Sequence, residues 1–461
     1  MPDGDPSSSR SRVDDRPKQR RPQAPWLSGI RLRPNRRMRC RYSSNLSLPA
    51  PSHGALVLVP ARVAGDEISG ELQQSLGRTE QAVTAFRTAL EDAPAGRPRL
   101  RARLGLAQGL SVLDRLDETV ALLEAAEAEA KADGLAIELS RLHTLRANIH
   151  FPRGEIERCL AEHSEALRLA EAAGAREEQA RALGGLADAY YMRGLYRTTE
   201  QMFQRCVDLS AAEGFRRIEA ANLPMLAFMV MFDLRFSEAL RLAERGIRLA
   251  DQIGHRRAAM IAHHARFFLC YDLCEFAEAA NSVTAAHEIA EALQARRFVA
   301  ETLMFRALLE HAVGDSRAHE TLREGLTIAR EHPFYLLPFG LGVLAMMTED
   351  AAERAAALSE GEALLAAGAV THNIPYFGRY AIEACLIAGD WSGTEHHAAT
   401  VASGMSAEPR PMTDFLVARG RALAAAGRGE GNAEELSRLL AAARASGWRA
   451  MLPRLEAAEI R

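Results

Sequence analysis

Glycine recurs at an interval of 40 residues between positions 134 and 254, and this period constrains the fold more than any other feature. Each glycine of the series follows a stretch of helical character, such as residues 166–173 or 207–213. A glycine just beyond the last turn commonly caps a helix in the left-handed conformation. The series consists of Gly134, Gly174, Gly214 and Gly254. This period predicts a repeat architecture rather than a domain with one central core.

A second series with the same interval marks a turn inside each repeat. Its members are Asp114, Gly154, Gly194, Leu234, Cys274 and Gly314. Two helices of roughly 14–17 residues fit between the marks, and the short link between them makes neighbouring helices antiparallel. Apolar residues make up 48% of the chain and aromatic residues only 6%. The abundance of alanine and leucine also favours helices over strands.

One repeat carries a full tetratricopeptide pattern. Residues 186–207 contain an aromatic residue in the first helix (Tyr190), the turn residue Gly194, the small Thr199 in the second helix, and then Phe203 and Cys206. The same spacing occurs in Gly77, Ala82, Phe86, Ala89, Leu90 and Pro94. The sequence therefore resembles tetratricopeptide proteins. We expect an all-α, superhelical solenoid of about ten helical hairpins with an approximately 40-residue period.

The chain is expected to divide into a basic leader, residues 1–65, and the solenoid, residues 66–461. The leader is rich in Pro, Ser and Arg without a period, which is typical of disordered segments. Residues 1–42 carry a net charge of +8, so the rest of this chain of net charge −3 carries −11. An acidic solenoid argues against nucleic acid as a partner, except through the leader. Prolines and glycines within 331–350 predict a break in the repeats there.

Apolar segments and cysteines bear on the compartment of the protein. The longest apolar stretches, 223–232 and 334–347, are too short to cross a bilayer, so no membrane contact is expected. Six cysteines lie far apart in this long chain and do not form a disulfide framework. These features predict a cytoplasmic protein with free thiols.

Seven short stretches resemble the carboxy-terminal region of large bacterial adenylate/guanylate cyclases. They are residues 141–148, 159–167, 182–191, 222–225, 254–257, 371–373 and 389–391. In that family a class III cyclase domain and a STAND-type ATPase precede a tetratricopeptide region. The resemblance covers residues 66–461 and implies a regulatory module from a cyclase-related bacterial signalling system. The two upstream domains of the family have no counterpart in this sequence.

The residues predict no catalysis, no cofactor and no metal. The two lysines, Lys18 and Lys131, follow Pro17 and Ala130, so neither belongs to the Gly-Lys-Ser/Thr motif that binds nucleotide phosphates. A cyclase also needs a sheet with two metal-binding aspartates, and no strand-rich stretch of that size occurs. We therefore expect that the protein is not an enzyme.

Histidines offer three candidate metal sites, and a structural role is the simpler interpretation of each. One group is spaced along two adjacent helices and consists of His143, His150, Cys159 and His163. These residues replace side chains that the repeat normally buries. The other candidates are the adjacent pairs His263-His264 and His396-His397. Neighbouring helix residues point about 100° apart, so surface positions are expected for these pairs.

Pairs of arginines open successive first helices at the same interval of 40. They are Arg216-Arg217, Arg256-Arg257 and Arg296-Arg297. Stacked repeats place them in one column, which forms either a ridge for an acidic partner or a set of ion pairs between repeats. Exposed arginines usually find local carboxylates, which favours the ion pairs.

The first helices of stacked hairpins are expected to line a concave surface. One position of these helices holds Asn148, Asp188, Phe228, Phe268 and Leu308, and the position beside it holds Phe151, Tyr191, Met231 and Tyr271. Residues 222–232 are apolar all round, which is typical of a helix that is buried on every side or faces a ligand. These nine residues either line a groove that binds a protein or peptide segment, or line a groove that the chain's own side chains fill.

Three functions fit these features. The first is a non-catalytic repeat scaffold or regulatory module that mediates protein–protein interaction. The second is a small-molecule-sensing domain like that of maltose-regulator-like transcription regulators. The third is a truncated remnant of a cyclase gene.

Overall fold

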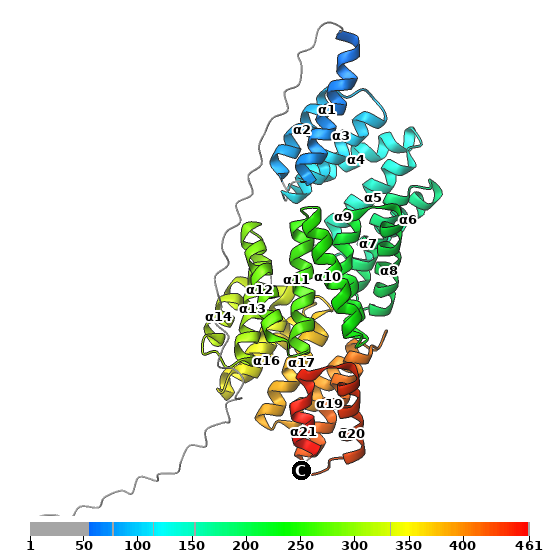
Figure 1. Cartoon of the computed structure of the whole chain (residues 1–461). Helices are drawn as coiled ribbons and strands as arrows, with labels where there is room; N and C mark the ends of the chain where they lie inside the picture. Colours follow the sequence, from blue (N-terminus) through cyan, green and yellow to red (C-terminus); the bar gives the residue numbers. More distant parts are fainter. Residues whose placement is uncertain (1–54, 76–77, 114, 152–153, 332, 460–461) are drawn as a thin grey trace, which may run out of the picture. The chain divides into compact units, whose positions relative to one another are not determined.

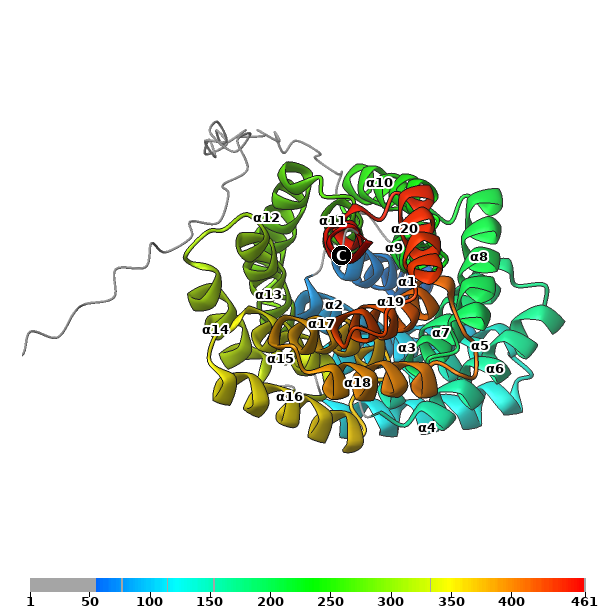
Figure 2. The same cartoon turned by 90° about the horizontal axis from the view of Figure 1, so that it is seen from below.

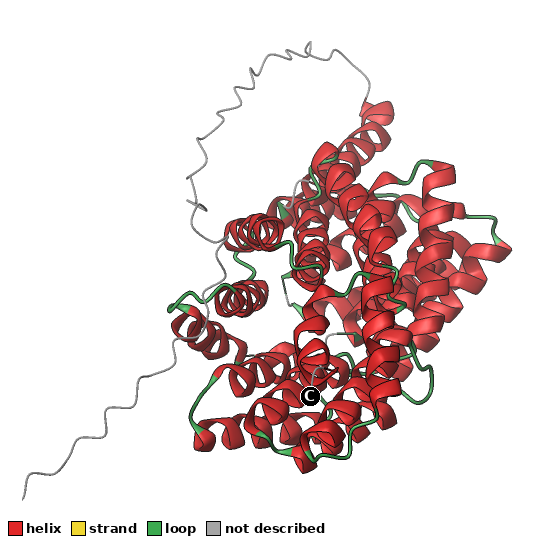
Figure 3. Ribbon diagram, turned by 60° about the horizontal axis from the view of Figure 1, so that its bottom comes forward, coloured by secondary structure: helices red, strands yellow, loops and turns green. Residues whose placement is uncertain are grey.

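The computed structural model describes residues 55–459 except 76–77, 114, 152–153 and 332. Within these residues the regular structure is helical throughout, with 21 α-helices and one 3₁₀ turn (Figures 1 and 3). None of these helices is long and apolar enough to cross a membrane. The expected all-α class is confirmed.

The helices form ten successive hairpins followed by a single closing helix. The first helices are α1 (Ala55–Ser75), α3 (Arg97–Val112), α5 (Ala136–His150), α7 (Arg176–Met192), α9 (Arg216–Phe232), α11 (Arg256–Asp272), α13 (Arg296–Ala312), α15 (Pro333–Met347), α17 (Asn373–Ala388) and α19 (Pro411–Gly427). The second helices are α2 (Thr79–Asp92), α4 (Leu116–Ala132), α6 (Ile156–Ala172), α8 (Tyr196–Glu213), α10 (Phe236–Gln252), α12 (Phe276–Ala292), α14 (Ala318–Ala329), α16 (Ala351–Ala366), α18 (Trp391–Gly404) and α20 (Ala433–Ser446). The chain ends with η1 (Arg449–Met451) and α21 (Leu452–Glu459).

The 40-residue period appears in the backbone as a series of left-handed residues. The cap glycines have φ values between 63° and 77°, as expected. Where the period falls on another residue the conformation persists, because Leu234, Cys274 and Gln294 have φ of 61°, 56° and 53°. Such a conformation costs a non-glycine residue roughly 1–2 kcal/mol. The packing of the repeats on both sides therefore determines the turn even without glycine.

Small residues on the second helices allow the hairpins to pack closely. One buried position at the same interval holds Ala126, Ala166, Cys206, Gly246 and Ala286. A Cβ atom at Gly246 would lie 3.4 Å from the Cβ atoms of both Ala262 and Leu223. First helices of consecutive hairpins also contact one another, so they form one continuous layer (Figure 2). This is the packing of a tetratricopeptide-like α-solenoid.

The end of the expected leader and the expected break both differ in detail. Helix α1 begins at Ala55, so residues 55–65 are helical, and Val63 is buried. The apolar, alanine-containing stretch at the start of α1 favours this helix. The rest of the leader lies outside the described residues. Near the expected break, α14 ends at Ala329 and α15 continues through Pro338, packing mainly against α16 and α17.

The C-terminal helices also contact the middle of the solenoid. Helix α19 contacts α9, and η1 contacts α11. The Trp448 ring is fully buried beside Phe236 of α10 and Phe415 of α19, with ring centroids 5.8 and 5.1 Å away. The last hairpins therefore pack on helices far from them in the sequence, which a plain stack of repeats does not require.

Candidate functional site

The apolar residues expected along the concave wall lie in the largest hydrophobic core. Phe228, Met231, Phe268 and Leu308 are all buried there. The Phe268 ring lies 6.1 Å from Phe339 of α15 and 5.6 Å from Tyr376 of α17, measured between centroids. Helices α15 and α17 thus supply the rings that cover this part of the wall. Other side chains of the same chain therefore cover these four residues, as the alternative interpretation of the wall predicts.

The other five wall residues retain some contact with solvent. Asn148 is exposed, and Phe151, Asp188, Tyr191 and Tyr271 are half-buried. Tyr191 stacks on His372 with 5.4 Å between ring centroids. The polar end of the wall, around Asp188 and Tyr191, therefore remains partly open to solvent.

Four charged residues and one tyrosine from four first helices gather at this polar end, and we call them the inner polar cluster. It consists of Asp188 of α7, Arg257 of α11, Arg297 and Glu301 of α13, and Tyr335 of α15. The Arg297 guanidinium lies over the Tyr335 ring, 4.0 Å from its centroid. Both arginines attract Glu301, and Arg257 also attracts Asp188. The period of 40 places Arg257 and Arg297 on neighbouring first helices, which explains why they meet.

Burial changes the protonation of this cluster. It raises the pKa of Asp188 to about 7, and the attraction of Arg257 only partly opposes this effect. Burial likewise raises the pKa of Glu301 to about 7 against the attraction of Arg297 and Arg257. Desolvation and the repulsion of Arg297 lower the pKa of Arg257, although the Arg257 residue as a whole is exposed to solvent. The two carboxyl groups of the cluster therefore keep their protons to a higher pH than ordinary aspartate and glutamate side chains do.

Glu301 has unsatisfied hydrogen-bonding capacity. Glu301 is 5% exposed, and its Oε2 atom lies 3.4 Å from His264 Nδ1. Burial lowers the pKa of His264 to about 3, so this ring is neutral at pH 7. Among the described residues, no group donates a hydrogen bond to Glu301 Oε1. A buried polar atom without a partner costs about 1–3 kcal/mol, and a ligand that supplies a donor removes that cost.

Sequence reasoning identified this site only in part. Asp188 was expected on the wall, whereas Arg257 and Arg297 were expected in a separate column. The sequence patterns did not point to Glu301, although a comparison of successive repeats within the chain distinguishes it. The equivalent positions 40 and 80 residues earlier hold Ile261 and Ala221, so a carboxylate stands where the repeat otherwise has an apolar residue.

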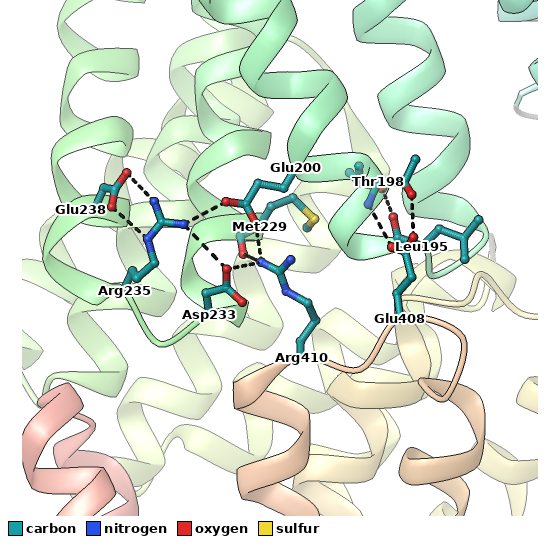
Figure 4. Close-up of polar contacts among 10 residues, drawn as sticks. Leu195, Thr198, Glu200, Met229, Asp233, Arg235, Glu238, Glu408 and Arg410 are labelled. Carbon is teal, nitrogen blue, oxygen red and sulfur yellow. Dashed lines mark hydrogen bonds and ion pairs between the residues drawn. The ribbon is translucent and has the colours of Figure 1, made fainter.

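A second polar group joins the C-terminal helices to the middle of the solenoid, and we call it the clasp. Arg410, which is 2% exposed, donates hydrogen bonds to Glu200 and to the carbonyl oxygen of Met229, 2.9 Å away, and pairs with Asp233 at 2.9 Å (Figure 4). Nearby, Glu408 accepts hydrogen bonds from the backbone N–H and the hydroxyl of Thr198 at 2.9 and 2.5 Å. Both groups lie on the link between α18 and α19. The clasp therefore ties this link to the start of α8 and to the end of α9.

A buried ion pair reinforces the same attachment. Arg379 of α17 donates two hydrogen bonds to Asp272 at the end of α11, at 3.1 and 2.5 Å. The pair is almost fully buried, and the guanidinium also lies 5.5 Å from the Trp448 ring centroid. Removing one member of a buried pair leaves an uncompensated charge, so this contact holds α17 in one position.

A cavity of about 310 Å³ lies between α18 and α19 beside the clasp. Apolar residues of both helices line it, together with Asp414 and Arg421. Its lining includes Pro409, which directly precedes Arg410 of the clasp. An occupant of this cavity would therefore touch the link that holds the C-terminal helices in place.

The histidine and arginine patterns resolve in different ways. His143 pairs with Glu162 and His150 with Glu155, each at 2.6 Å, so these two rings have carboxylate partners instead of converging. His264 and His397 are buried, and the expected surface positions are wrong for both, because each lies on the side of its helix that faces a neighbouring hairpin. Arg296 pairs with Glu331 at the start of the next repeat, in keeping with ion pairing between repeats.

Comparison with known proteins shows the fold. No protein-family model matches the sequence, and no curated protein matches it. A solved Rap protein complexed with competence and sporulation factor is 15% identical with a TM-score of 0.54, and the match covers 80% of this chain and 99% of that one. The apo form of RapI is 14% identical with a TM-score of 0.52, covering 76% of this chain and 98% of that one. At these identities the likeness shows a common helical-repeat fold, and this chain is similar in fold to Rap proteins over most of its length.

Proposed function

We propose that this chain is a non-catalytic regulatory repeat module that binds a peptide or protein segment at the inner polar cluster. The observation that carries the proposal is the buried Glu301 carboxyl group, whose Oε1 atom has no donor among the described residues, beside Arg257 and Arg297. A peptide offers both complements, since its N–H groups donate to Glu301 and its carboxylates accept from the arginines. Such charge-assisted hydrogen bonds are roughly twice as strong as neutral ones.

The fold supports a binding role. A solved protein of similar fold is complexed with competence and sporulation factor. First helices form a continuous layer here, so residues far apart in sequence present side chains to one ligand. The resemblance to cyclase-associated repeats favours bacterial signalling as the context of this binding.

Peptide selection tests the proposal. The purified chain is immobilised, and peptides of about ten residues are selected from a random library and measured by fluorescence anisotropy. We expect the selected peptides to carry a carboxylate and to lose at least tenfold in affinity with Arg297→Ala and Glu301→Gln. Arg256→Ala is the matched control, because this exposed arginine lies on the same helix as Arg257. Equal binding by all four proteins would place the peptide elsewhere.

The cavity between α18 and α19 favours small-molecule sensing as the second candidate. Its volume of about 310 Å³ matches the lower range of pockets that hold small ligands. A ligand there would act on the clasp. A screen of metabolites by thermal shift separates the two functions, because Val417→Trp fills the cavity and leaves the inner polar cluster unchanged.

A further inference from the structure

Three side chains from two second helices meet at the outer part of the eighth and ninth hairpins. Glu362 lies on α16, and the adjacent His396 and His397 lie on α18. Glu362 Oε1 is 2.9 Å from His396 Nε2 and 3.6 Å from His397 Nδ1. Both imidazole rings thus reach one oxygen of one carboxylate.

This convergence overcomes the usual obstacle to adjacent histidines. Consecutive helix positions diverge by about 100°, so two such rings seldom face one point. Here the rings use different nitrogens. The exposed His396 reaches with its distal Nε2 atom, and the buried His397 with its nearer Nδ1 atom. The difference in reach compensates for the difference in direction.

The distances match those of a metal site. Zinc binds imidazole nitrogen and carboxylate oxygen at about 2.0–2.2 Å, so two ligands in a tetrahedral shell lie about 3.3 Å apart. The two measured separations, 2.9 and 3.6 Å, lie on either side of this value. One candidate ligand atom from each of the three residues lies within 4.8 Å of the others. The three side chains are therefore close enough together to share one ion.

The surroundings hold the ligands while leaving one side open. The side chain of His397 is 5% exposed, and the Phe377 ring packs against it nearly perpendicular, with 5.7 Å between centroids. Glu362 and His396 are 41% and 63% exposed. Packing thus orients one ligand, and the open side allows an ion to enter and a water molecule to complete the shell. Among the described residues no other group of three His, Cys, Asp or Glu side chains comes as close together.

We propose that Glu362, His396 and His397 bind a divalent transition-metal ion, zinc in the first instance, and that the ion links α16 to α18. Imidazole and carboxylate ligands suit zinc, nickel and copper better than magnesium or calcium. The two helices belong to consecutive hairpins, so the ion joins two repeats. Helix α18 also lines the cavity and leads into the clasp, so metal binding would stiffen the segment that carries Arg410.

Isothermal titration with ZnCl₂ tests the proposal on the full chain, purified without a histidine tag and treated with chelator. We expect one ion per chain, and Co²⁺ in its place should give the visible absorption of a four-coordinate ion. Glu362→Gln and His396→Ala should each weaken binding at least tenfold. Both side chains are well exposed, so these variants should keep the far-ultraviolet circular dichroism of the natural chain.

His319→Ala is the control, because this histidine lies on α14 and is not one of the three ligands. It should bind zinc like the natural chain. Two results would overturn the proposal. One is the lack of measurable binding up to about 100 µM zinc, and the other is binding that Glu362→Gln and His396→Ala leave unchanged.

Discussion

Replacing Phe268 by alanine distinguishes a core position from a partner-binding position. The Phe268 residue is 5% exposed, and its ring centroid lies between 4.7 and 6.2 Å from five other aromatic rings. Deleting a buried phenylalanine side chain costs about 3–5 kcal/mol. Aromatic pairs contribute about 0.5–1.5 kcal/mol each beyond the buried area. We therefore expect the free energy of unfolding to fall by about 4–5 kcal/mol, at the upper end of that range.

Urea unfolding followed by circular dichroism measures this change, and the same variant is tested for peptide binding. Leu293→Ala is the control, because this residue is 39% exposed and its change should stay within about 0.5 kcal/mol. A loss below about 1 kcal/mol for Phe268→Ala, together with weakened peptide binding, would refute the reasoning. It would show that the ring faces a partner rather than the core.

Three other predictions concern the clasp, the inner polar cluster and catalysis. Arg410→Ala should lower the free energy of unfolding by about 3 kcal/mol, since it removes the buried cation that pairs with both Glu200 and Asp233 and leaves the more exposed Arg235 as their partner. Limited proteolysis should then cut the link between α18 and α19, and an intact link would contradict this. Because the pKa of Glu301 is raised to about 7, the native state holds its proton longer than the unfolded state, so stability should fall as pH rises from about 4.5 to 7. Glu301→Gln should flatten that fall in melting experiments at several pH values, and an unchanged profile would place the titration elsewhere. The purified chain should neither hydrolyse ATP nor form cyclic AMP in radiometric assays, because neither of its lysines belongs to a phosphate-binding motif; turnover that persists through purification would show the opposite.

The hairpins were predictable because their signals are local and repeated. Gly134 and Gly194 mark helix ends that depend only on neighbouring residues. The period even locates Leu234, which keeps the left-handed turn without glycine. The pattern on each helix therefore contains nearly everything needed to predict a hairpin and its register.

The coverage of the wall was not predictable in the same way. Within its own repeat, Phe268 occupies a position on the concave wall. Its burial depends on Tyr376, which lies about a hundred residues later in the sequence. The period becomes irregular after α14, so it does not show which helix returns to the middle. Arg410 likewise stands in a link whose sequence carries no recognisable signal, although its partners are distant acids.

The clasp has a consequence for how the chain folds and comes apart. Thr198 and Glu408 are 210 positions apart in sequence, whereas an ordinary solenoid is held by contacts between adjacent repeats. An open array can unravel from its free end one repeat at a time. Here the last hairpins are tied to the centre. Their unfolding therefore requires that the ion pairs of Arg410 and the Arg379–Asp272 pair break first. Closing so long a loop also raises the contact order, and we expect folding to be slower than in an open array of the same length, with the C-terminal helices docking last.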